Sequence, residues 1–299
     1  MRRKRTSPGP SAGELITKSE RRLRRARVFF GHGTDNARDE AAALVFHAMR
    51  LRHDAAPAAL RRRATGAQEM LVERLLEQRI VGRVPLAYLT HEAWFAGLRF
   101  YVDERVLIPR SPFAELIERR FEPWIDARRV TRALDIGTGS GCIALAMAKA
   151  LPRARVDAVD IDAGALQVAE INCRRLRLTR RVRLVQSDHF AALSGESYDI
   201  IASNPPYVGH REMRGLPREY RHEPALALES GREGLDSVAV ILEHAARHLR
   251  PHGVLVVEVG NTERALMRAY PRLPFTWLDF ERGGGGIFLL TREQLIQGQ

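Results

Sequence analysis

The chain has 299 residues, enough for one large domain or two modest ones, and its hydrophobic content of 45% is ordinary for a globular protein. It contains no run of about eighteen apolar residues and no apolar segment behind its basic first residues, so neither a membrane span nor a secretory signal is predicted. The two cysteines, Cys142 and Cys173, lack paired-ligand spacing and the ten histidines form no cluster, so we expect no metal site and reduced thiols in the cytoplasm.

The net charge of +12 is concentrated near the N-terminus. Residues 1–63 contain sixteen Lys or Arg and six Asp or Glu, a surplus of ten. Residues 1–18 are polar and include Ser, Pro and Gly, which predicts a disordered basic arm. The run RRLRRAR at residues 21–27 is expected on a helix, either as a solvated face or as a patch for ribosomal RNA or a ribosomal precursor. We expect removal of residues 1–27 to weaken binding to such precursors and to leave turnover intact.

The next segments predict a change from helices to a sheet. Residues 19–83 have apolar positions at three- and four-residue spacings and predict a small helical domain. Residues 84–110 contain alternating aromatics around a glycine, in WFAGLRFYV, and predict a β-hairpin linker. In residues 111–299 strands and helices alternate, which predicts a parallel sheet with helices on both faces. At its end PFTWLDF and IFLLT are expected to form an antiparallel pair joined by a tight glycine turn at residues 283–286.

A glycine-rich turn, GTGSG, follows the apolar segment RALDI and precedes a helical pattern. Gly137, Gly139 and Gly141, with Thr138 between them, would let the backbone approach a ligand at a helix N-terminus. At the end of the predicted strand, Asp135 would repel a pyrophosphate and attract the ammonium group of an amino-acid ligand. By itself, the loop is equally consistent with a generic nucleotide or packing loop.

Two further predicted strands also end in carboxylates. The segment ARVDAVDID contains Asp160, placed to accept hydrogen bonds from ribose hydroxyls, and then Ile161. The segment VRLVQSD ends at Asp188, followed by His189 and Phe190, which offers a carboxylate for an adenine amino group and a ring to stack on it. Either aspartate could instead be a helix N-cap. Because open α/β sheets bind ligands at the carboxyl ends of their strands, the combination predicts S-adenosylmethionine as the cofactor.

The tetrapeptide Asn204-Pro205-Pro206-Tyr207 follows the β-rich run YDIIAS. The side-chain oxygen of Asn204 and the backbone carbonyl of Pro205 can each accept one N–H of a planar NH2 group, and Tyr207 can enclose that group. This arrangement suits methyl transfer to an amide or an exocyclic amine. The alternative is a rigid turn followed by a core tyrosine.

These motifs resemble a known family. LDIGTGSG, VDAVDID, SD and NPPY resemble the class I methyltransferases, and RVPLAYLTHEAWFAGLRFYVDERVLIPRSPFAELI resembles the protein-glutamine N-methyltransferases. EYRHEPALALESGREGLD, PFTWLDFERGGGGIFLLT and FGHGTDNARDEAAALVFHAM narrow the resemblance to members that methylate a glutamine of the third large-subunit ribosomal protein. The resemblance implies an α/β fold, in which a seven-stranded, Rossmann-like, S-adenosylmethionine-dependent domain follows a small helical domain and a hairpin linker. It leaves out the arginine-rich first 27 residues.

The resemblance also implies roles for individual residues. Asn204, which also borders the cofactor, and Pro205 are expected to be catalytic, and substrate binding is expected from Pro206, Tyr207, Glu223 and Pro224. Holding both N–H groups of a glutamine amide would aim its nitrogen at the methyl donor and stabilise the developing positive charge. The helical domain is expected to recognise the protein substrate. Arg110 is expected either to help enclose substrate and donor or to be a surface residue at a helix entry.

Three alternatives stay open at this point. A release-factor glutamine methyltransferase would share the catalytic motifs and differ in its N-terminal domain. A nucleic-acid amino-methyltransferase could use the same tetrapeptide for adenine or guanine, and the basic N-terminus would suit RNA. A non-catalytic assembly factor could use its basic helices to hold a ribosomal precursor.

Overall fold

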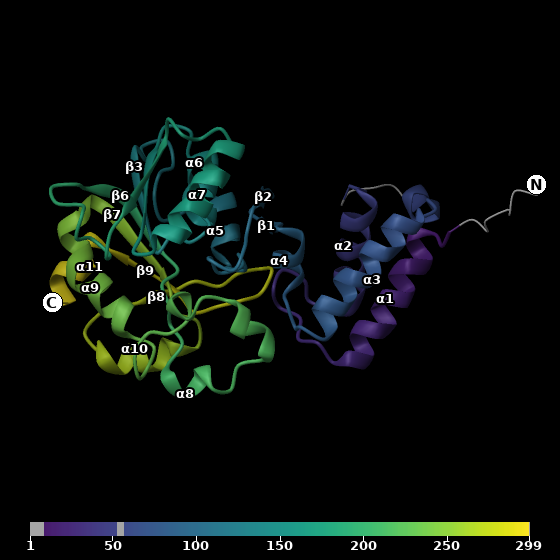
Figure 1. Cartoon of the computed structure of the whole chain (residues 1–299). Coiled ribbons are helices and arrows are strands. Elements are labelled where there is room, and N and C mark those ends of the chain that lie inside the picture. Colours follow the sequence, from purple (N-terminus) through teal and green to yellow (C-terminus); the bar gives the residue numbers. More distant parts are fainter. Residues whose placement is uncertain (1–8, 53–56, 299) are drawn as a thin grey trace, which may run out of the picture. The chain divides into compact units, whose positions relative to one another are not determined.

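The structure is a computed structural model that describes residues 9–52 and 57–298 (Figure 1). The chain folds into two compact units. The helical unit comprises the described residues up to His91 together with Pro217–His222, and the sheet unit comprises Glu92–Leu216 and the described residues from Glu223 onward. No helix in these described ranges is long and apolar enough to cross a membrane.

Helices α1, α2 and α3 form the core of the helical unit. The elements up to His91 are α1 (Ala12–Ala26), α2 (Ala37–Met49), the 3-10 helix η1 (Pro57–Arg61), α3 (Gly66–Ile80) and α4 (Leu86–Thr90). Capping boxes begin α1 at Ser11 and α3 at Thr65, where each side-chain oxygen accepts a hydrogen bond from the backbone N–H three residues on. Leu15, Leu44 and Leu76 are among the apolar side chains buried between the three long helices.

The predicted disordered arm is wrong for residues 12–18, which form the first turns of α1. The capping box of Ser11 and Glu14 satisfies the first backbone donors, and Leu15 and Ile16 are 2% and 1% exposed in the core. Residues 1–8 lie outside the described part of the chain. Because α1 is a core helix, removal of residues 1–27 would disrupt the helical unit, and the expectation of intact turnover does not hold for that truncation.

A buried arginine connects three segments of the helical unit. Arg79 in α3 is 1% exposed; its Nε donates to Glu40 of α2 at 2.6 Å and its Nη1 donates to Glu219 at 3.2 Å. Its Nη2 donates to the carbonyl oxygen of Phe29 at 2.6 Å, while the Phe29 N–H donates to Glu219 at 3.0 Å. Glu219 belongs to the 3-10 helix η2 (Arg218–His222), 140 residues beyond Arg79 in the chain. A segment that follows the NPPY motif therefore completes the interior of the helical unit.

The sheet unit begins with an antiparallel hairpin, β1 (Ala93–Phe95) and β2 (Leu98–Phe100). Its turn residues, Ala96 and Gly97, have φ values of 47° and 70°, the positive values that a tight type I′ hairpin turn needs. The hairpin lies inside the segment 84–110, where the alternating aromatics predict it.

Seven strands form a mixed sheet in the order β5-β4-β3-β6-β7-β9-β8. They are β3 (Arg132–Ile136), β4 (Arg155–Asp160), β5 (Val182–Gln186), β6 (Tyr198–Ser203), β7 (Leu249–Glu258), β8 (Thr276–Trp277) and β9 (Ile287–Thr291). The first five strands in that spatial order are parallel, and β9 pairs antiparallel with both β7 and β8. The chain order reverses between β3 and β6, and such a switch point is where open α/β sheets bind ligands.

Helices cover both faces of this sheet, and each face has its own apolar cluster (Figure 1). One face carries α5 (Phe113–Glu118), α6 (Cys142–Ala150) and α7 (Ala163–Arg175), and the other carries α9 (Asp236–His248), α10 (Glu263–Ala269) and α11 (Arg292–Gly298). Short turns at α8 (His210–Met213), η3 (Ala225–Ala227) and η4 (Gly260–Thr262) follow β6 and β7. The crossover from β5 to β6, residues 187–197, contains neither helix nor strand.

The C-terminal strands pair as predicted, but the tight glycine turn between them is wrong. Residues 278–286 separate β8 from β9. Backbone N–H groups of Glu281 and Arg282 both donate to the carboxylate of Glu115 at 3.1 Å, which holds this loop against α5. A Cβ on Gly286 would lie 2.3 Å from the carbonyl oxygen of Gly260, so a glycine here permits close backbone approach.

Arg79→Ala is expected to lower the free energy of unfolding by about 3–5 kcal/mol, because the buried carboxylate of Glu40 would lose its cation and Glu219 would keep only Arg83, at 3.5 Å. Chemical denaturation followed by circular dichroism measures this loss. Arg38→Ala is the control: it removes an exposed ion pair with Glu20, and about 1 kcal/mol or less should be lost. Equal losses in the two variants would contradict the role given to the buried cluster.

Candidate functional site

A cavity of about 950 Å³ opens at the carboxyl ends of β3, β4, β5 and β6. Its walls come from the segment 105–111, the glycine loop after β3, the ends of β4 and β5, the NPPY segment after β6, and one side of α9. Predicted site residues that line it are Gly137, Thr138, Gly139, Asp160, Ile161, Asp188, His189, Phe190, Asn204, Pro205, Pro206 and Pro224. The fold therefore brings predicted site residues from the ends of four different strands to one cavity.

The three glycines of the loop have positive φ but different surroundings. Gly137 and Gly139, at φ 69° and 54°, have open space where a Cβ would project, so their bare backbone faces the cavity. A Cβ on Gly141 would meet Leu145 at 3.1 Å and Ala169 at 3.2 Å. The first two glycines thus leave room for a ligand, and the third serves helix packing.

Asp135 lies beneath this loop and is fully buried. Its Oδ2 accepts hydrogen bonds from the Thr138 hydroxyl at 2.6 Å and the Ala144 N–H at 3.0 Å, but its Oδ1 has no partner among the described residues. Burial raises the pKa of Asp135 to about 7, and the nearby Asp160 carboxylate contributes to this rise. A buried acceptor without a donor is costly, and a cationic ligand group would relieve that cost.

Asp160 ends β4 at the edge of the cavity. It accepts hydrogen bonds from the Gly139 N–H at 2.8 Å and the Asp162 N–H at 3.0 Å. Burial raises its pKa above the ordinary value. The N-cap of α7 is Asp162, whose side chain accepts from the Gly164 N–H, so the capping alternative for Asp160 is wrong. Next to it, Ile161 is 49% exposed and presents an apolar side chain to the cavity.

The crossover after β5 contributes Asp188, His189 and Phe190 to the cavity wall. The Asp188 carboxylate lies 2.6 Å from His189 Nδ1, and no helix begins at this position, so the capping alternative for Asp188 is wrong as well. Phe190 is 7% exposed and its ring stacks on that of His248 in α9, with 4.6 Å between centroids. One side of this predicted stacking ring is therefore occupied by the protein itself.

The NPPY segment divides between the cavity and the interior. The Oδ1 of Asn204 is buried without a hydrogen-bond partner among the described residues, at the edge of the cavity. Tyr207 does not line the cavity: its hydroxyl donates to Glu258 Oε1 at 3.1 Å, and its ring packs against Gly260, where a Cβ would lie 2.6 Å from a ring carbon. The structure thus places Tyr207 as a support of the segment.

Glu258, at the end of β7, is a residue that the sequence reasoning missed. It is 6% exposed and accepts hydrogen bonds from both Tyr207 and the Ser111 hydroxyl. Burial raises its pKa, against the opposing effect of these two donors. The available signal was a glutamate directly after the apolar run VLVV, at the same sheet edge as the other site residues.

Glu223 is held by the protein's own groups. Its carboxylate accepts a hydrogen bond from the Ile108 N–H at 3.0 Å and a bidentate pair from Arg110 at 2.6 and 2.8 Å. Arg110 is therefore not a free surface residue at a helix entry, and the pairing fixes the segment that carries Pro224, which does line the cavity. Sequence alone could not reveal a pair 113 residues apart.

Comparison with known proteins agrees with this architecture. Residues 121–218 match the family model of the methyltransferase small domain. The catalytic domain of human Mettl16 superposes with a TM-score of 0.50 at 18% identity, covering 77% of this chain and 84% of that one, which shows a shared fold. The sheet order, the switch-point cavity and these matches define a class I methyltransferase.

Relatives at much higher identity specify the family. Ribosomal protein uL3 glutamine methyltransferase of Neisseria meningitidis is 50% identical over 276 residues, covering 92% of this chain and 91% of its own length. The proteins of that name from Xanthomonas campestris and Bordetella pertussis are 48% and 47% identical, covering 95% and 94% of this chain and 92% and 95% of theirs. The chain belongs to the ribosomal protein uL3 glutamine methyltransferase family.

The pH dependence of the free energy of unfolding should reveal the raised pKa of Asp135. Because its pKa rises from an ordinary 3.8 to about 7 in the folded protein, its contribution to stability is present at low pH and is lost as the pH rises through 7. We therefore expect the stability of the wild type, relative to Asp135→Asn, to decline between about pH 4 and 7. Denaturation of both proteins across this range measures it, and a constant difference would show that Asp135 titrates normally.

Proposed function

We propose that the protein transfers a methyl group from S-adenosylmethionine to the side-chain amide nitrogen of a glutamine in ribosomal protein uL3. The observation that carries this proposal is the buried Oδ1 of Asn204 at the cavity edge, which has no hydrogen-bond partner in the described part of the chain and offers an acceptor to an incoming N–H group. The names of the relatives at 47–50% identity support the choice of acceptor.

The residues of the cavity fit S-adenosylmethionine, which supplies an electrophilic methyl group on a sulfonium when it is bound. The Oδ1 of Asp135, which has no partner among the residues that the structure describes, would accept a hydrogen bond from the amino-acid ammonium when the Asp135 carboxyl is ionised. Each carboxylate oxygen can accept more than one hydrogen bond, so Asp160 retains acceptor capacity for ribose hydroxyls. Ile161 and Phe190 provide apolar surface for adenine, with the Asp188 carboxylate available for its amino group.

The acceptor amide is a weak nucleophile because its nitrogen lone pair is delocalised into the carbonyl. Asn204 Oδ1 and the Pro205 carbonyl would accept its two N–H groups, orient the nitrogen and stabilise positive charge as the N–C bond forms and the methyl–sulfur bond of the donor breaks, with a neutral thioether as the leaving group. One N–H proton then passes to water, so the chain needs no strong base. In this scheme Glu258 and Glu223 act as positioning residues: Glu258 fixes Tyr207, and Glu223 fixes the segment that carries Pro224.

Asn204→Ala is expected to reduce methyl transfer by at least about 100-fold, the order of effect seen when one preorganised transition-state hydrogen bond is lost. Binding of S-adenosylmethionine, measured by calorimetry, should stay within a few-fold of the wild type because the change faces the acceptor. The matched control is Asn261→Ala, which alters an exposed asparagine outside the cavity. Turnover of Asn204→Ala at the rate of this control would reject the mechanism.

The same assay decides the acceptor. Purified protein, labelled S-adenosylmethionine and separate samples of uL3, a peptide release factor and ribosomal RNA are incubated, and mass spectrometry locates the label. Label on a glutamine of uL3 supports the proposal. Label on a release-factor glutamine alone would keep the chemistry and reject the substrate, and label on RNA alone would reject both.

We further propose that the helical unit contacts ribosomal RNA. Arg21, Arg25 and Arg27 are exposed, as are Arg61 and Arg62, and none of these five has a carboxylate partner within the described ranges. Neighbouring cations, by contrast, are paired: Arg22 with Glu73, Arg24 with Glu20, and Arg63 with Glu14. Unpaired arginines are available to neutralise phosphates and release counterions.

Arg21→Gln/Arg25→Gln should weaken binding to ribosomal RNA and lower the slope of log affinity against log salt by about one unit per lost phosphate contact. Turnover on free uL3 should be unchanged, since neither side chain lies at the cavity. Arg177→Gln/Arg180→Gln, two exposed arginines of the sheet unit, is the charge-matched control. Identical salt slopes for both variants would contradict a specific RNA surface on the helical unit.

A further inference from the structure

The crossover from β5 to β6, residues 187–197, forms one wall of the cavity without a helix or strand of its own. Asp188, Phe190 and Glu196 are among its residues that line the cavity. Its internal backbone hydrogen bonds are those of three turns, from the N–H groups of Ala191, Leu193 and Glu196 to the carbonyl oxygens three residues earlier, and turns alone do not fix a segment against the rest of the fold. Its position therefore depends on side-chain contacts with the elements around it.

Three of these contacts join the crossover to α9. His189 Nε2 lies 2.7 Å from the Ser237 hydroxyl, at the start of the helix. The ring of Phe190 stacks on His248, near the helix end, with an interplanar angle of 13°. The same His248 also donates through Nδ1 to the backbone carbonyl of Glu196 at 3.1 Å. The crossover is thus held along one side by the helix.

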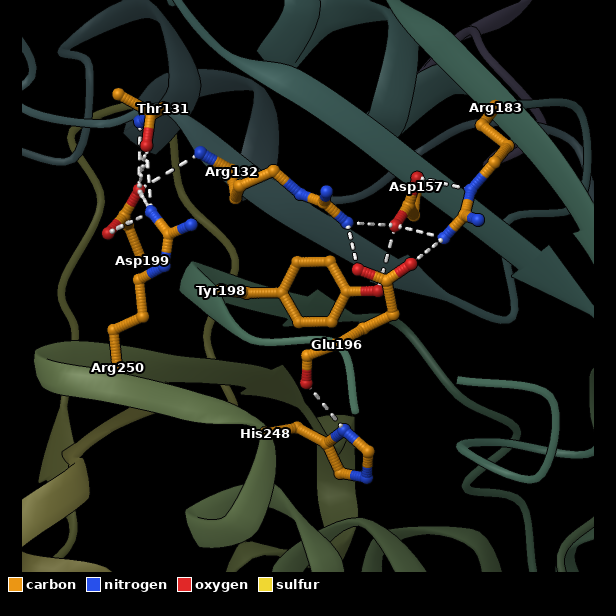
Figure 2. Close-up of polar contacts among 9 residues, drawn as sticks. All are labelled: Thr131, Arg132, Asp157, Arg183, Glu196, Tyr198, Asp199, His248 and Arg250. Atoms are coloured by element: carbon orange, nitrogen blue, oxygen red, sulfur yellow. Dashed lines mark hydrogen bonds and ion pairs between the residues drawn. The ribbon is translucent and has the colours of Figure 1, made fainter. Parts of the chain in front are cut away.

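A fourth contact joins the far end of the crossover to the sheet (Figure 2). The Glu196 carboxylate accepts hydrogen bonds from Arg132 of β3 at 2.7 Å and from Arg183 of β5 at 2.9 Å. Both arginines also bind Asp157 of β4, at 2.8 Å from Arg132 and at 2.9 and 2.7 Å from Arg183. The Tyr198 hydroxyl donates to Asp157 at 2.8 Å, so three neighbouring strands and the first residue of β6 share one network.

The electrostatics of the network favour a fixed geometry. Asp157 is 4% exposed, and although burial opposes it, hydrogen bonds from Arg183 and Tyr198 keep the pKa of Asp157 below its ordinary value. Glu196 lies at the outer side of the network, with 29% of its side chain exposed. Two arginines held by a buried carboxylate offer Glu196 a preformed site, unlike an isolated surface pair whose side chains must first be ordered.

We propose that Glu196 is a positioning residue for the cofactor: its ion pairs with Arg132 and Arg183 hold the crossover 187–197 so that Asp188 and Phe190 present a fixed wall to the adenine-binding side of the cavity. This inference rests on the proposed use of S-adenosylmethionine. It goes beyond that use, because it assigns affinity for the cofactor to a salt-bridge network at the sheet.

An aspartate beside this network provides a control for the role of Glu196. Asp199 accepts hydrogen bonds from the Thr131 N–H at 2.8 Å, the Arg132 N–H at 2.9 Å and Arg250 at 3.1 Å, and thereby joins β6 to the start of β3 and to β7 (Figure 2). Among the described residues, the Asp199 side chain bonds only Thr131, Arg132 and Arg250, and so makes none of the contacts that hold residues 187–197. Loss of Asp199 should destabilise the sheet without releasing the crossover.

The test compares Glu196→Ala, Glu196→Gln and Asp199→Asn in the full-length protein. Calorimetry gives the Kd for S-adenosylmethionine, steady-state assays give separate KM values for cofactor and uL3, and thermal denaturation gives Tm. We expect Glu196→Ala to raise the Kd and KM for the cofactor about tenfold, equivalent to 1.4 kcal/mol, with KM for uL3 within twofold of the wild type. Glu196→Gln, which keeps an acceptor for one arginine, should give an intermediate Kd. Asp199→Asn should lower Tm and leave the cofactor Kd unchanged.

Hydrogen exchange adds a local readout, since Glu196→Ala should speed exchange in residues 187–197 and Asp199→Asn should not. The positioning role is overturned if Glu196→Ala leaves the Kd for the cofactor unchanged, or if Asp199→Asn raises it equally. Wild-type binding and turnover separately test the proposed function: a wild type that binds and methylates, with an unaffected Glu196→Ala variant, rejects the positioning role alone. A wild type that does not bind S-adenosylmethionine rejects both.

Discussion

Two buried side-chain oxygens at the carboxyl edge of the sheet, Asp135 Oδ1 and Asn204 Oδ1, have no hydrogen-bond donor within the described ranges. In the protein without a ligand, each unsatisfied acceptor lowers the free energy of unfolding by about 1–3 kcal/mol. The two residues lie at the ends of neighbouring strands, because β3 pairs with β6. In that pairing Ile136, which follows Asp135, lies opposite Ser203, which precedes Asn204. The sheet therefore fixes the separation between these two oxygens.

The sheet and the segments without regular structure contribute differently to the cavity. Parallel strands bring the carboxyl ends together, while segments without regular structure supply much of the cavity wall. Each segment is held by a charged group: Glu223 with Arg110, Glu258 with Tyr207, and Glu196 with Arg132 and Arg183. Such contacts reduce the conformational freedom of segments that have no helix or strand of their own.

The sequence was a good guide wherever a local rule determines structure. The class I fold is confirmed, and the glycine loop, the two aspartates after the next strands and the NPPY motif converge on one cavity, because each signal lies within a few residues of a strand end. The start of α1 was missed although Ser11 and Glu14 form a readable capping box, since the composition of residues 1–18 outweighed it. At this position the capping box predicts the helix start better than the composition of the segment does.

Other errors had no local signal to correct them. Tyr207 faces Glu258 and not the cavity, and Glu223 binds Arg110, because the partners lie 51 and 113 residues away. The glycine run 283–286 predicts a turn. In the structure, Gly286 instead lies so close to the backbone of Gly260 that a side chain would not fit there. Such pairings depend on the folded chain, and one sequence without its fold does not show them.

The burial of Arg79 also constrains when the helical unit can complete its folding. Its partner Glu219 follows 140 residues later, so during synthesis the helical unit emerges without the carboxylate that completes its interior. At about 5–20 residues per second the ribosome needs about 7–28 s to supply that residue. During this interval Glu40 is the only one of the two carboxylates that can bind Arg79, and the helical unit can reach its native arrangement only after much of the sheet unit has also been translated.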